Sequence, residues 1–322
     1  MGGCTPVALP PGVQYTKLSA GGGFTLGLGS DGLLRAWGDP YFTDITPPPL
    51  PPGLSYVDVA AGTGFVSALR SNGTIVAWGL NYWNETNVPA LPPGLTYTKV
   101  DVGSGHTVAL RSNGTIAAWG GENEYGQLNV STPALPPGVT YVDVAAGTYH
   151  TIALRSDGQL RHWGATNYGV GTLPPLPPGV TYVDVTAGGY NSAALRSDGQ
   201  IVAWGLSNPA GIVPVLPAGV SYVAVDAGNS HTVALRSDGR VVCFGNNDYV
   251  QCGLPPTPAG VQIERAALFG HTALLYSNGQ IYSTPSGWGP TGVVPTLPAG
   301  VRFTDLSVGG FYNAALRSDG QI

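Results

Sequence analysis

Short runs of alternating apolar and polar residues recur along the whole chain, separated by turns rich in glycine and proline. A representative stretch holds YVDVAAG at 141–147, HTIALRS at 150–156 and QLRHWG at 159–164. A period of two is typical of β-strands with one buried face. The SDG or SNG between the second and third runs predicts a tight hairpin turn, because Asp-Gly and Asn-Gly tolerate a positive φ. A looser fourth run, such as 88–92, completes a unit of four predicted strands, and no run has helical periodicity.

This unit repeats about every 41 residues from one end of the chain to the other. Such a period indicates one supersecondary unit stacked many times. Four short strands per unit predict an all-β fold, a β-propeller of four-stranded blades, as a single domain over 1–322. The turn that opens each unit begins at Leu9, Leu50, Leu91, Leu135, Leu176, Leu216 and Leu297, with a degenerate copy at Thr257.

The repeated residues carry a family resemblance. The pattern A-G-x-x-H-T-x-A-L-R-S-D-G-x-x-x-x-W-G resembles the regulator-of-chromosome-condensation repeat. The short period and the xNxxGQxxVPA connector, best matched at 123–134, resemble most the bacterial β-lactamase inhibitory protein II-like branch. The resemblance implies a propeller whose partner is a protein, which could be an enzyme held inhibited. The eukaryotic members that exchange guanine nucleotides have longer units, so the resemblance does not imply that activity.

The number of blades follows from how the ends of the chain are used. Seven units are complete, and the eighth stops at Ile322. Seven blades, which we favour, run from Leu33 to Arg317 and close by pairing the two ends, as in the inhibitor branch; residues 1–32 are then surplus. Eight blades, the alternative, use 1–32 but lack at least one strand in the last blade. Either way we expect an unmatched strand edge, and such edges recruit other strands.

Composition and motifs exclude several classes of function. The 49 glycines and 29 prolines accompany 43% hydrophobic residues, as expected for an ordered, turn-dense protein. Two lysines and a net charge of −5 provide no basic surface for nucleic acid. No apolar run approaches the length of a membrane span. We find no nucleophile elbow, metal-spaced cluster or phosphate-binding loop, and therefore expect no catalysis, no cofactor and no metal.

Three residue types recur at fixed registers, and we expect them to be structural. The tryptophans are expected to pack blade against blade. The histidine register also accepts Phe and Asn; phenylalanine cannot replace a metal ligand, so these histidines are expected to be buried and hydrogen-bonded. The arginines before the turns and the aspartates of the first run predict a structural network between neighbouring turns or strands. The positions are Trp37, Trp78, Trp119, Trp163 and Trp204; His106, His150, His231 and His271; Arg70, Arg111, Arg155, Arg196, Arg236 and Arg317; and Asp58, Asp143, Asp184 and Asp305.

Variable residues gather on one face of the predicted disc. In an up-and-down blade, the loop after the first strand and the loop after the third strand emerge on the same face. These loops differ from unit to unit and combine aromatic with polar residues, the composition of a protein-binding surface. The alternative is that each aromatic caps its own blade. The candidate partner-binding residues are Tyr41, Phe42, Tyr82, Trp83, Glu122, Tyr125, Tyr149, Tyr168, Tyr190, Asp248, Tyr249, Trp288, Phe311 and Tyr312.

The chain has three cysteines. Cys243 and Cys252 lie on either side of one loop and could pair. Cys243, however, replaces an alanine of the repeat, so we favour the simpler interpretation of a small buried residue.

The sequence therefore predicts a non-catalytic protein-binding scaffold that docks a partner protein on the aromatic face, and the resemblance extends this prediction to an enzyme inhibitor. Two alternatives come from other classes: a structural surface array that assembles through the incomplete terminal blades, and a glycan-binding propeller. We expect no nucleic-acid partner and no membrane insertion. Few lysines and the bacterial type of repeat favour an extracellular or cell-surface protein of a bacterium, although the start of the chain has no visible signal peptide.

Overall fold

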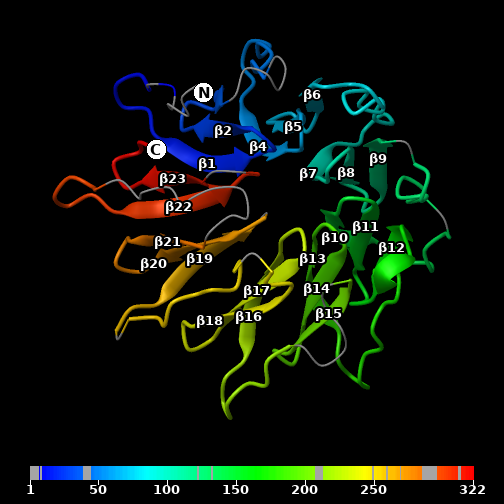
Figure 1. Cartoon of the computed structure of the whole chain (residues 1–322). Helices are drawn as coiled ribbons and strands as arrows, with labels where there is room; N and C mark the ends of the chain where they lie inside the picture. Colours follow the sequence, from blue (N-terminus) through cyan, green and yellow to red (C-terminus); the bar gives the residue numbers. More distant parts are fainter. Residues whose placement is uncertain are drawn as a thin grey trace.

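Eight antiparallel sheets stand around a common axis in the computed structural model of the protein (Figure 1). The structure describes the chain except residues 1–6, 8, 39–44, 122, 132, 207–212, 249, 259, 269, 285–295 and 311–312, and the side chain of Tyr168. Among the described residues, seven sheets have three strands and the last has two. This arrangement supports the predicted all-β propeller.

Each sheet follows chain order, with a single 3-10 turn, η2 (Asn167–Gly169), among the described connections. The strands are β1 (Tyr15–Ala20), β2 (Phe24–Gly29), β3 (Leu34–Gly38), β4 (Tyr56–Ala61), β5 (Phe65–Arg70), β6 (Ile75–Gly79), β7 (Tyr97–Val102), β8 (His106–Arg111), β9 (Ile116–Gly120), β10 (Tyr141–Ala146), β11 (His150–Arg155), β12 (Leu160–Gly164), β13 (Tyr182–Ala187), β14 (Asn191–Arg196), β15 (Ile201–Gly205), β16 (Tyr222–Ala227), β17 (His231–Arg236), β18 (Val241–Gly245), β19 (Ile263–Leu268), β20 (Thr272–Tyr276), β21 (Ile281–Ser283), β22 (Phe303–Val308) and β23 (Asn313–Arg317).

The sheet of β10, β11 and β12 illustrates how one unit folds. β10 pairs with β11 and β11 with β12, both antiparallel, as the three alternating runs predict. In the turn between β11 and β12, Gly158 has a φ of +74° and its N–H donates to the carbonyl of Arg155. Glycine adopts this φ without the Cβ clash that other residues meet. The SDG turn therefore specifies the hairpin from local sequence alone.

The fourth strand that the sequence predicts in each unit is not formed at 88–92, so this prediction is wrong there. Prolines at 89 and 92 have no N–H with which to continue a ladder. The segment is instead held through its carbonyls, since the hydroxyl of Tyr97 donates to the carbonyl of Pro89 at 3.1 Å. Tyr56, Tyr182 and Tyr222 hold prolines at the end of the preceding unit in the same way.

The predicted seven-blade closure is also not observed among the described residues. It requires β3 to join the terminal strands β22 and β23, whereas β3 pairs with β2 in the first sheet. The reason is the short turn at 30–33, since closing a local hairpin costs far less chain entropy than bringing the two ends of the chain together. β1 and β2 are therefore part of a complete sheet rather than a surplus segment, and eight sheets make up the ring.

Neighbouring sheets are joined by the same backbone hydrogen bond around the ring. The first residue of each first strand donates its N–H to the carbonyl of the turn glycine in the preceding sheet, at 2.7 to 3.2 Å. The bond between Tyr15 and Gly320 joins the last sheet to the first, so the ring closes through it. The pairs are Tyr15–Gly320, Tyr56–Gly32, Tyr97–Gly73, Tyr141–Gly114, Tyr182–Gly158, Tyr222–Gly199, Ile263–Gly239 and Phe303–Gly279.

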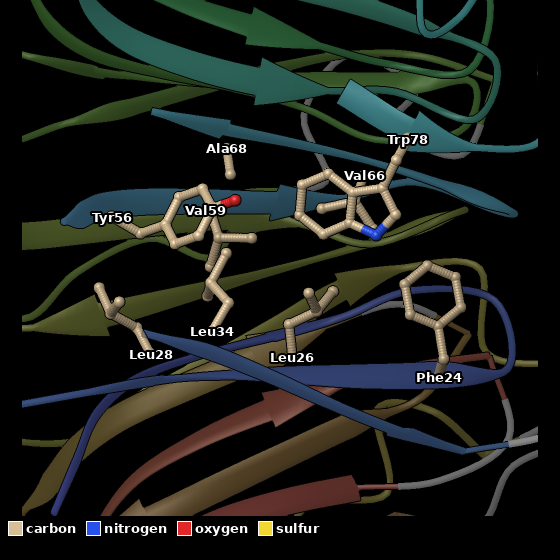
Figure 2. Packing of buried hydrophobic residues seen from close by; sticks show 9 residues of the cluster. All are labelled: Phe24, Leu26, Leu28, Leu34, Tyr56, Val59, Val66, Ala68 and Trp78. Atoms are coloured by element: carbon tan, nitrogen blue, oxygen red, sulfur yellow. The ribbon is translucent and has the colours of Figure 1, made fainter. Parts of the chain in front are cut away.

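The hydrophobic core is divided into clusters that lie between neighbouring sheets rather than in one centre. In the cluster of Figure 2, Leu28 and Leu34 of the first sheet face Tyr56 and Val59 of the second. Another cluster joins β1 to β23, with Tyr15 and Leu18 against Leu316. Each sheet thus buries its apolar side chains only when its neighbours are in place, as expected for a repeat architecture.

Side chains of the first strands add polar cross-links around the central channel. The hydroxyl of Ser19 accepts the N–H of Ala61 at 3.0 Å, and a carboxylate oxygen of Asp101 accepts the N–H of Ala146 at 2.8 Å. The hydroxyl of Ser307 accepts the N–H of Ala20 at 3.1 Å and so joins the last sheet to the first. These bonds supply partners for edge N–H groups that have no strand beside them.

The tryptophan register packs one unit against the next, as predicted. Trp119 is buried and stands 6.2 Å from the ring of Tyr97. Its indole N–H donates at 3.0 Å to the carbonyl of Glu85, in the connection that follows the preceding sheet. Trp204 and Trp78 make the equivalent bonds to the carbonyls of Val170 and Ile45. These three tryptophans therefore fasten the loop of the neighbouring unit as well as filling the interface.

The histidine register is also structural. The ring nitrogen Nε2 of His106 shares a hydrogen bond with Thr151 of the next sheet at 3.0 Å, and that of His150 does so with Ser192 at 2.9 Å. Burial lowers the pKa of His106 to about 4 and that of His150 to about 3, because the charged form would lose its hydration. Asn191 occupies the same register and bonds Thr232 at 3.1 Å. The exchange of His and Asn thus conserves the cross-blade bond.

Ion pairs form within turns and between first strands. Arg155 pairs with Asp157 of its own SDG turn, and Arg196, Arg236 and Arg317 do the same in theirs. Between neighbouring first strands, Lys17 pairs with Asp58, Lys99 with Asp143 and Arg265 with Asp305. The predicted structural network is therefore present, with the arginines acting inside turns and the aspartates between strands. All four aspartates accept the N–H of the next residue, and among the described residues Asp184 alone of the four has no ion pair.

We expect Trp119→Ala to lower the free energy of unfolding by about 3–5 kcal/mol, because it leaves a cavity between two sheets. Trp119→Phe, which copies Phe244 of the sixth unit, should cost about 1–3 kcal/mol, because the buried carbonyl of Glu85 loses its donor. Denaturant unfolding measures both. A Trp119→Phe variant as stable as the parent chain would contradict the role given to the indole N–H.

We expect the free energy of unfolding to fall as the pH is lowered from about 6.5 towards 4, because the unfolded chain takes up protons on histidines that stay neutral when folded. Four buried aspartates oppose this, because burial raises their pKa values: Asp226 to about 6, and Asp101, Asp184 and Asp305 in the same direction. The five histidines outnumber them, since burial lowers the pKa of every one, to about 4 for His106, His162 and His231 and to about 3 for His150.

His150→Asn, which copies Asn191, should keep the bond to Ser192 and reduce the acid loss by on the order of 2 kcal/mol. Denaturant unfolding at neutral and acid pH compares the variant with the parent chain. An unchanged acid loss in the variant would show that His150 does not contribute to it.

Candidate functional site

Loops from neighbouring sheets meet on one face of the ring, as the strand order requires. The turn between the first and second strands lies beside the connection after the third strand, because all strands are antiparallel. The N–H of Leu80 donates to the carbonyl of Gly64 at 2.9 Å, and that of Ala165 to the carbonyl of Tyr149 at 2.9 Å. The predicted sharing of this face by the two variable loops is confirmed.

A pocket of about 350 Å³ opens on this face between the second, third and fourth sheets. Its walls come from the connections after β6 and β9 and from three turns between first and second strands. The lining residues are Thr63, Gly64, Phe65, Leu80, Tyr82, Trp83, Glu85, Ser104, Gly105, His106, Gly121, Glu124, Tyr125, Gln127, Thr148 and Tyr149.

Aromatic rings dominate the rim of this pocket. Tyr82 is 77% exposed, Trp83 and Tyr125 are each 47% exposed, and Tyr149 is 38% exposed. The rings of Tyr82 and Trp83 lie 6.4 Å apart, those of Tyr125 and Tyr149 5.3 Å apart, and Tyr190 extends the second group at 5.9 Å from Tyr149. Side chains this exposed do not bury themselves against their own blades. They form a surface that a partner can cover.

Polar groups lie beneath and beside the rings. Glu85 is only 3% exposed, and its carboxylate accepts the N–H of Trp83 at 2.8 Å. Gln127 and His106 are buried in the floor, and Glu124 is exposed at the rim. The pocket therefore combines an apolar rim with carboxylates and a neutral imidazole.

The loops that carry the aromatics are held by a repeated asparagine. Asn81, Asn123 and Asn247 begin three of the connections after the third strands. The side-chain oxygen of each accepts the N–H five residues later, at 3.0 Å from Thr86, 2.9 Å from Leu128 and 2.8 Å from Cys252. This local bond closes each loop on itself, as asparagine does in turns.

The third residue after that asparagine has a left-handed backbone. Gly126 has a φ of +78°, Asn84 of +64° and Val250 of +62°. Glycine and asparagine tolerate this conformation, whereas a β-branched residue is strained there. The following residue, Glu85, Gln127 or Gln251, is buried in all three loops. The shared backbone thus presents different side chains from one rigid frame.

Five of the predicted partner-binding residues come together, and one does not. Tyr82, Trp83, Tyr125 and Tyr149 surround the pocket, and Tyr190 continues their surface. Asp248 lies apart from the pocket, and its carboxylate accepts the side-chain N–H of Asn246 in its own loop at 2.7 Å. The backbone of Tyr168 lies in η2. The predictions on Tyr41, Phe42, Glu122, Tyr249, Trp288, Phe311, Tyr312 and the side chain of Tyr168 lie outside the described residues.

Several lining residues were not among the predicted ones. His106 and Phe65 belong to the register assigned to structure, and they also form the floor of the pocket. Gln127 follows the loop glycine in the connector motif, so its fixed spacing from Asn123 could have indicated a buried position. Leu80 carries no signal in the sequence that separates it from other loop residues.

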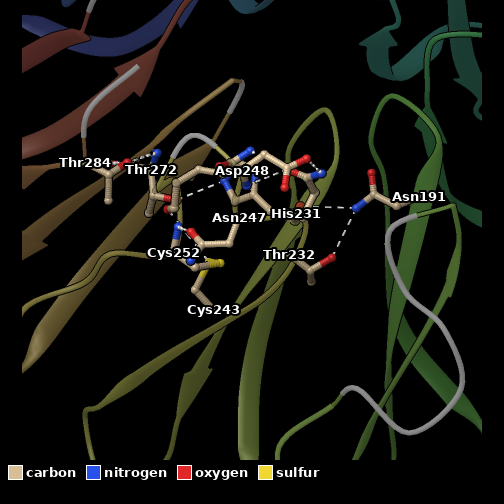
Figure 3. Close-up of a disulfide and its surroundings, with 11 residues drawn as sticks. Asn191, His231, Thr232, Cys243, Asn247, Asp248, Cys252, Thr272 and Thr284 are labelled. Carbon is tan, nitrogen blue, oxygen red and sulfur yellow. Dashed lines mark hydrogen bonds between the residues drawn. A yellow bond between two sulfur atoms is a disulfide. The ribbon is translucent and has the colours of Figure 1, made fainter. Parts of the chain in front are cut away.

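Cys243 and Cys252 form a disulfide, which corrects the prediction of an unpaired buried cysteine (Figure 3). Their Cα atoms are 5.2 Å apart, a usual separation for this bond. The loop after β18 folds back on itself and brings the two cysteines together. Other units have an alanine at the register of Cys243, and this led to the prediction of a small unpaired residue. The disulfide fastens the base of the sixth-unit loop, beside the strained Val250.

A second cavity, of about 510 Å³, is the central channel lined by the first strands of all eight sheets. Its polar groups are already engaged: Lys17 and Lys99 pair with aspartates, and the hydroxyl of Thr186 donates to the carboxylate of Asp226 at 3.1 Å. Its walls hold structural contacts rather than a rim of exposed side chains. The aromatic pocket is therefore the candidate binding site.

The described residues offer neither a metal cluster nor a membrane-spanning helix. No group of three or more His, Cys, Asp or Glu side chains among them is arranged to hold a metal ion. None of the helical segments within that part of the chain is long and apolar enough to cross a membrane.

Comparisons with known proteins agree with this architecture. Residues 97–127, 141–170, 182–211 and 222–251 match the family model of the regulator of chromosome condensation (RCC1) repeat. Curated protein sequences give no match. With the solved structures below, the four repeats support an RCC1-type β-propeller.

Three solved structures show the extent of the likeness. Human WBSCR16 is 16% identical with a TM-score of 0.61, covering 84% of this chain and 88% of its own. Yeast RCC1 (Prp20) bound to Kap60 is 20% identical with a TM-score of 0.62, covering 95% and 81%. The ectodomain of the Physcomitrella patens receptor kinase CR4 is 21% identical with a TM-score of 0.61, covering 89% and 76%. At these identities the likeness concerns the fold.

We expect Val250→Gly to raise the free energy of unfolding by about 1 kcal/mol, because glycine relieves the left-handed strain by more than its own entropy costs. Gly126 provides the precedent at the same loop position. Val250→Ala, which retains a Cβ, serves as the control and should gain less. Denaturant unfolding compares the three proteins, and a glycine variant less stable than the parent would contradict the strain.

Proposed function

We propose that this chain is a non-catalytic scaffold that binds a partner protein on its aromatic face. The observation that carries the proposal is the exposure of Tyr82, Trp83, Tyr125 and Tyr149 around one pocket. Tyrosine and tryptophan are the residues that dominate binding energy at protein interfaces, where partly buried rings are covered on association. Asn81 and Asn123 hold the loops in place, which limits the entropy lost on binding.

The fold is used for protein binding elsewhere. Yeast Prp20 has been described with its binding to Gsp1p and histones, and its structure has been solved with Kap60. At 20–21% identity these structures support the general role of a binding scaffold and do not extend their own partners to this chain. A more specific form of the proposal, in keeping with the sequence resemblance, is that the partner is an enzyme that the scaffold inhibits.

The proposal includes export from a bacterial cell. The disulfide between Cys243 and Cys252 supports it, because such bonds persist in oxidising compartments and are rare in the cytosol. Two lysines in the whole chain and its acidic balance suit a surface that does not bind nucleic acid.

Capture of partners from cell extract and culture fluid of the source organism tests the proposal. We expect Tyr82→Ala with Trp83→Ala to lower the affinity for the true partner by about tenfold or more, as at other aromatic hot spots. The control carries Val57→Ser and Val142→Ser, which remove exposed apolar side chains at the opposite ends of the first strands. It should bind like the parent chain.

Several outcomes would overturn the proposal. Partners that bind the aromatic variant and the parent equally well would do so, as would binding of defined glycans through the same rings. A mass in solution that grows with concentration, with no partner retained, would favour assembly between copies. If an enzyme is captured, its activity in the presence of the chain decides whether the complex is inhibitory.

A further inference from the structure

The aromatic pocket carries negative charge that no described residue compensates. Glu85 and Glu124 both line it, and its described lining contains no lysine or arginine. Within the described part of the chain, neither carboxylate takes part in an ion pair. The ion pairs found there lie in turns or between first strands, away from the pocket. The site is therefore complementary to a positive group.

The carboxylate of Glu85 is a departure from the loop pattern. Gln127 and Gln251 stand at the same position of equivalent loops, after residues with the same left-handed backbone. All three side chains are buried, at 2 to 4% exposure. Burying a carboxylate costs more than burying an amide unless a positive partner accompanies it. The second unit thus has a buried carboxylate, that of Glu85, at a position where the same loop backbone is formed with a neutral glutamine in two other units.

The rings around the pocket favour the same kind of ligand. The faces of Trp and Tyr attract cations within about 6 Å of the ring centre. Tyr82 and Trp83 come from the connection after β6, which also carries Glu85, and Tyr125 comes from the connection after β9, which also carries Glu124. Tyr149 completes the rim from the turn between β10 and β11. His106 in the floor adds no positive charge at neutral pH, since burial lowers its pKa to about 4.

We propose that this pocket receives an arginine side chain from a basic segment of the partner protein. The inference rests on the proposed function and names the chemistry of its partner. A guanidinium group is flat and stacks on aromatic rings, is weakly hydrated, and donates hydrogen bonds in a fork that suits a carboxylate. The pocket volume of about 350 Å³ lies within the range of built ligand sites.

Capped tripeptides test the proposal without knowledge of the partner. The probes are Gly-Arg-Gly, Gly-Lys-Gly and Gly-citrulline-Gly, and binding is followed by NMR of the indole N–H signals and by calorimetry. We expect the arginine peptide to bind about tenfold more tightly than the citrulline peptide, which has almost the same shape without the charge. The lysine peptide should lie between them, and binding should weaken as salt is added.

Variants locate the binding in the pocket. Glu85→Gln copies Gln127 and Gln251 and should therefore fold; with Glu124→Gln it should remove most of the preference for arginine over citrulline. Tyr125→Ala should weaken the arginine peptide by about fivefold. The matched controls are Glu264→Gln, an exposed carboxylate on β19, and Val183→Ala, an exposed apolar side chain on β13 that does not line the pocket. Both should bind the arginine peptide like the parent chain.

The outcomes separate this inference from the proposed function. Equal binding of the arginine and citrulline peptides, or a preference that survives Glu85→Gln with Glu124→Gln, overturns the inference. If Tyr82→Ala with Trp83→Ala still abolishes partner capture in that case, the scaffold function stands with an uncharged partner group. Binding of neutral sugars in place of the peptides would overturn both.

Discussion

The contact between one sheet and the next is the interaction on which this molecule depends. A three-stranded sheet has two faces and is too small to bury either one alone. Each interface therefore repeats an N–H bond from the first strand to the preceding turn glycine and an apolar cluster. At several interfaces a side chain of one first strand also accepts an N–H of the neighbouring first strand. Because the Tyr15–Gly320 bond and the β1–β23 cluster complete the set, stability is shared around a closed ring.

The same interface reaches the binding face through the tryptophan register. Trp119 fills the space between two sheets and its indole N–H holds the carbonyl of Glu85, whose side chain lines the pocket. The floor of the pocket is likewise shared with the core, since His106 bonds Thr151 of the next sheet. The loops of the binding face are thus bonded directly to the core, and this holds the exposed aromatic rings in position in the absence of a partner.

Charge is used sparingly and in separate places. Five of the eleven arginines pair with an aspartate of their own turn, and the two lysines pair with aspartates between first strands. These pairs leave the aromatic face with carboxylates and no described cation in its pocket. The net charge of −5 is therefore not spread evenly over the molecule. A positively charged ligand can compensate the part of it that the carboxylates of the pocket contribute.

Local sequence determined the elements of this protein: the alternating runs set the three strands of each sheet, and the SDG turn set the hairpins through a glycine at positive φ. It also placed the variable loops on one face and identified four of the aromatic residues at the pocket.

The features that the sequence did not determine depended on contacts between residues that are distant in the chain. The sequence predicted a strand at Pro89, whereas the structure shows its carbonyl bonded to the hydroxyl of Tyr97. It also predicted that β3 joins the strands at the end of the chain, whereas β3 pairs with β2. The disulfide depended on how the loop after β18 returns on itself, and the meeting of Glu85 with Glu124 in one pocket required the ring to bring loops of two units together. Periodicity in the sequence indicates on which face of its own strand a residue lies. Which residues of different units come into contact is decided only when the sheets pack against one another.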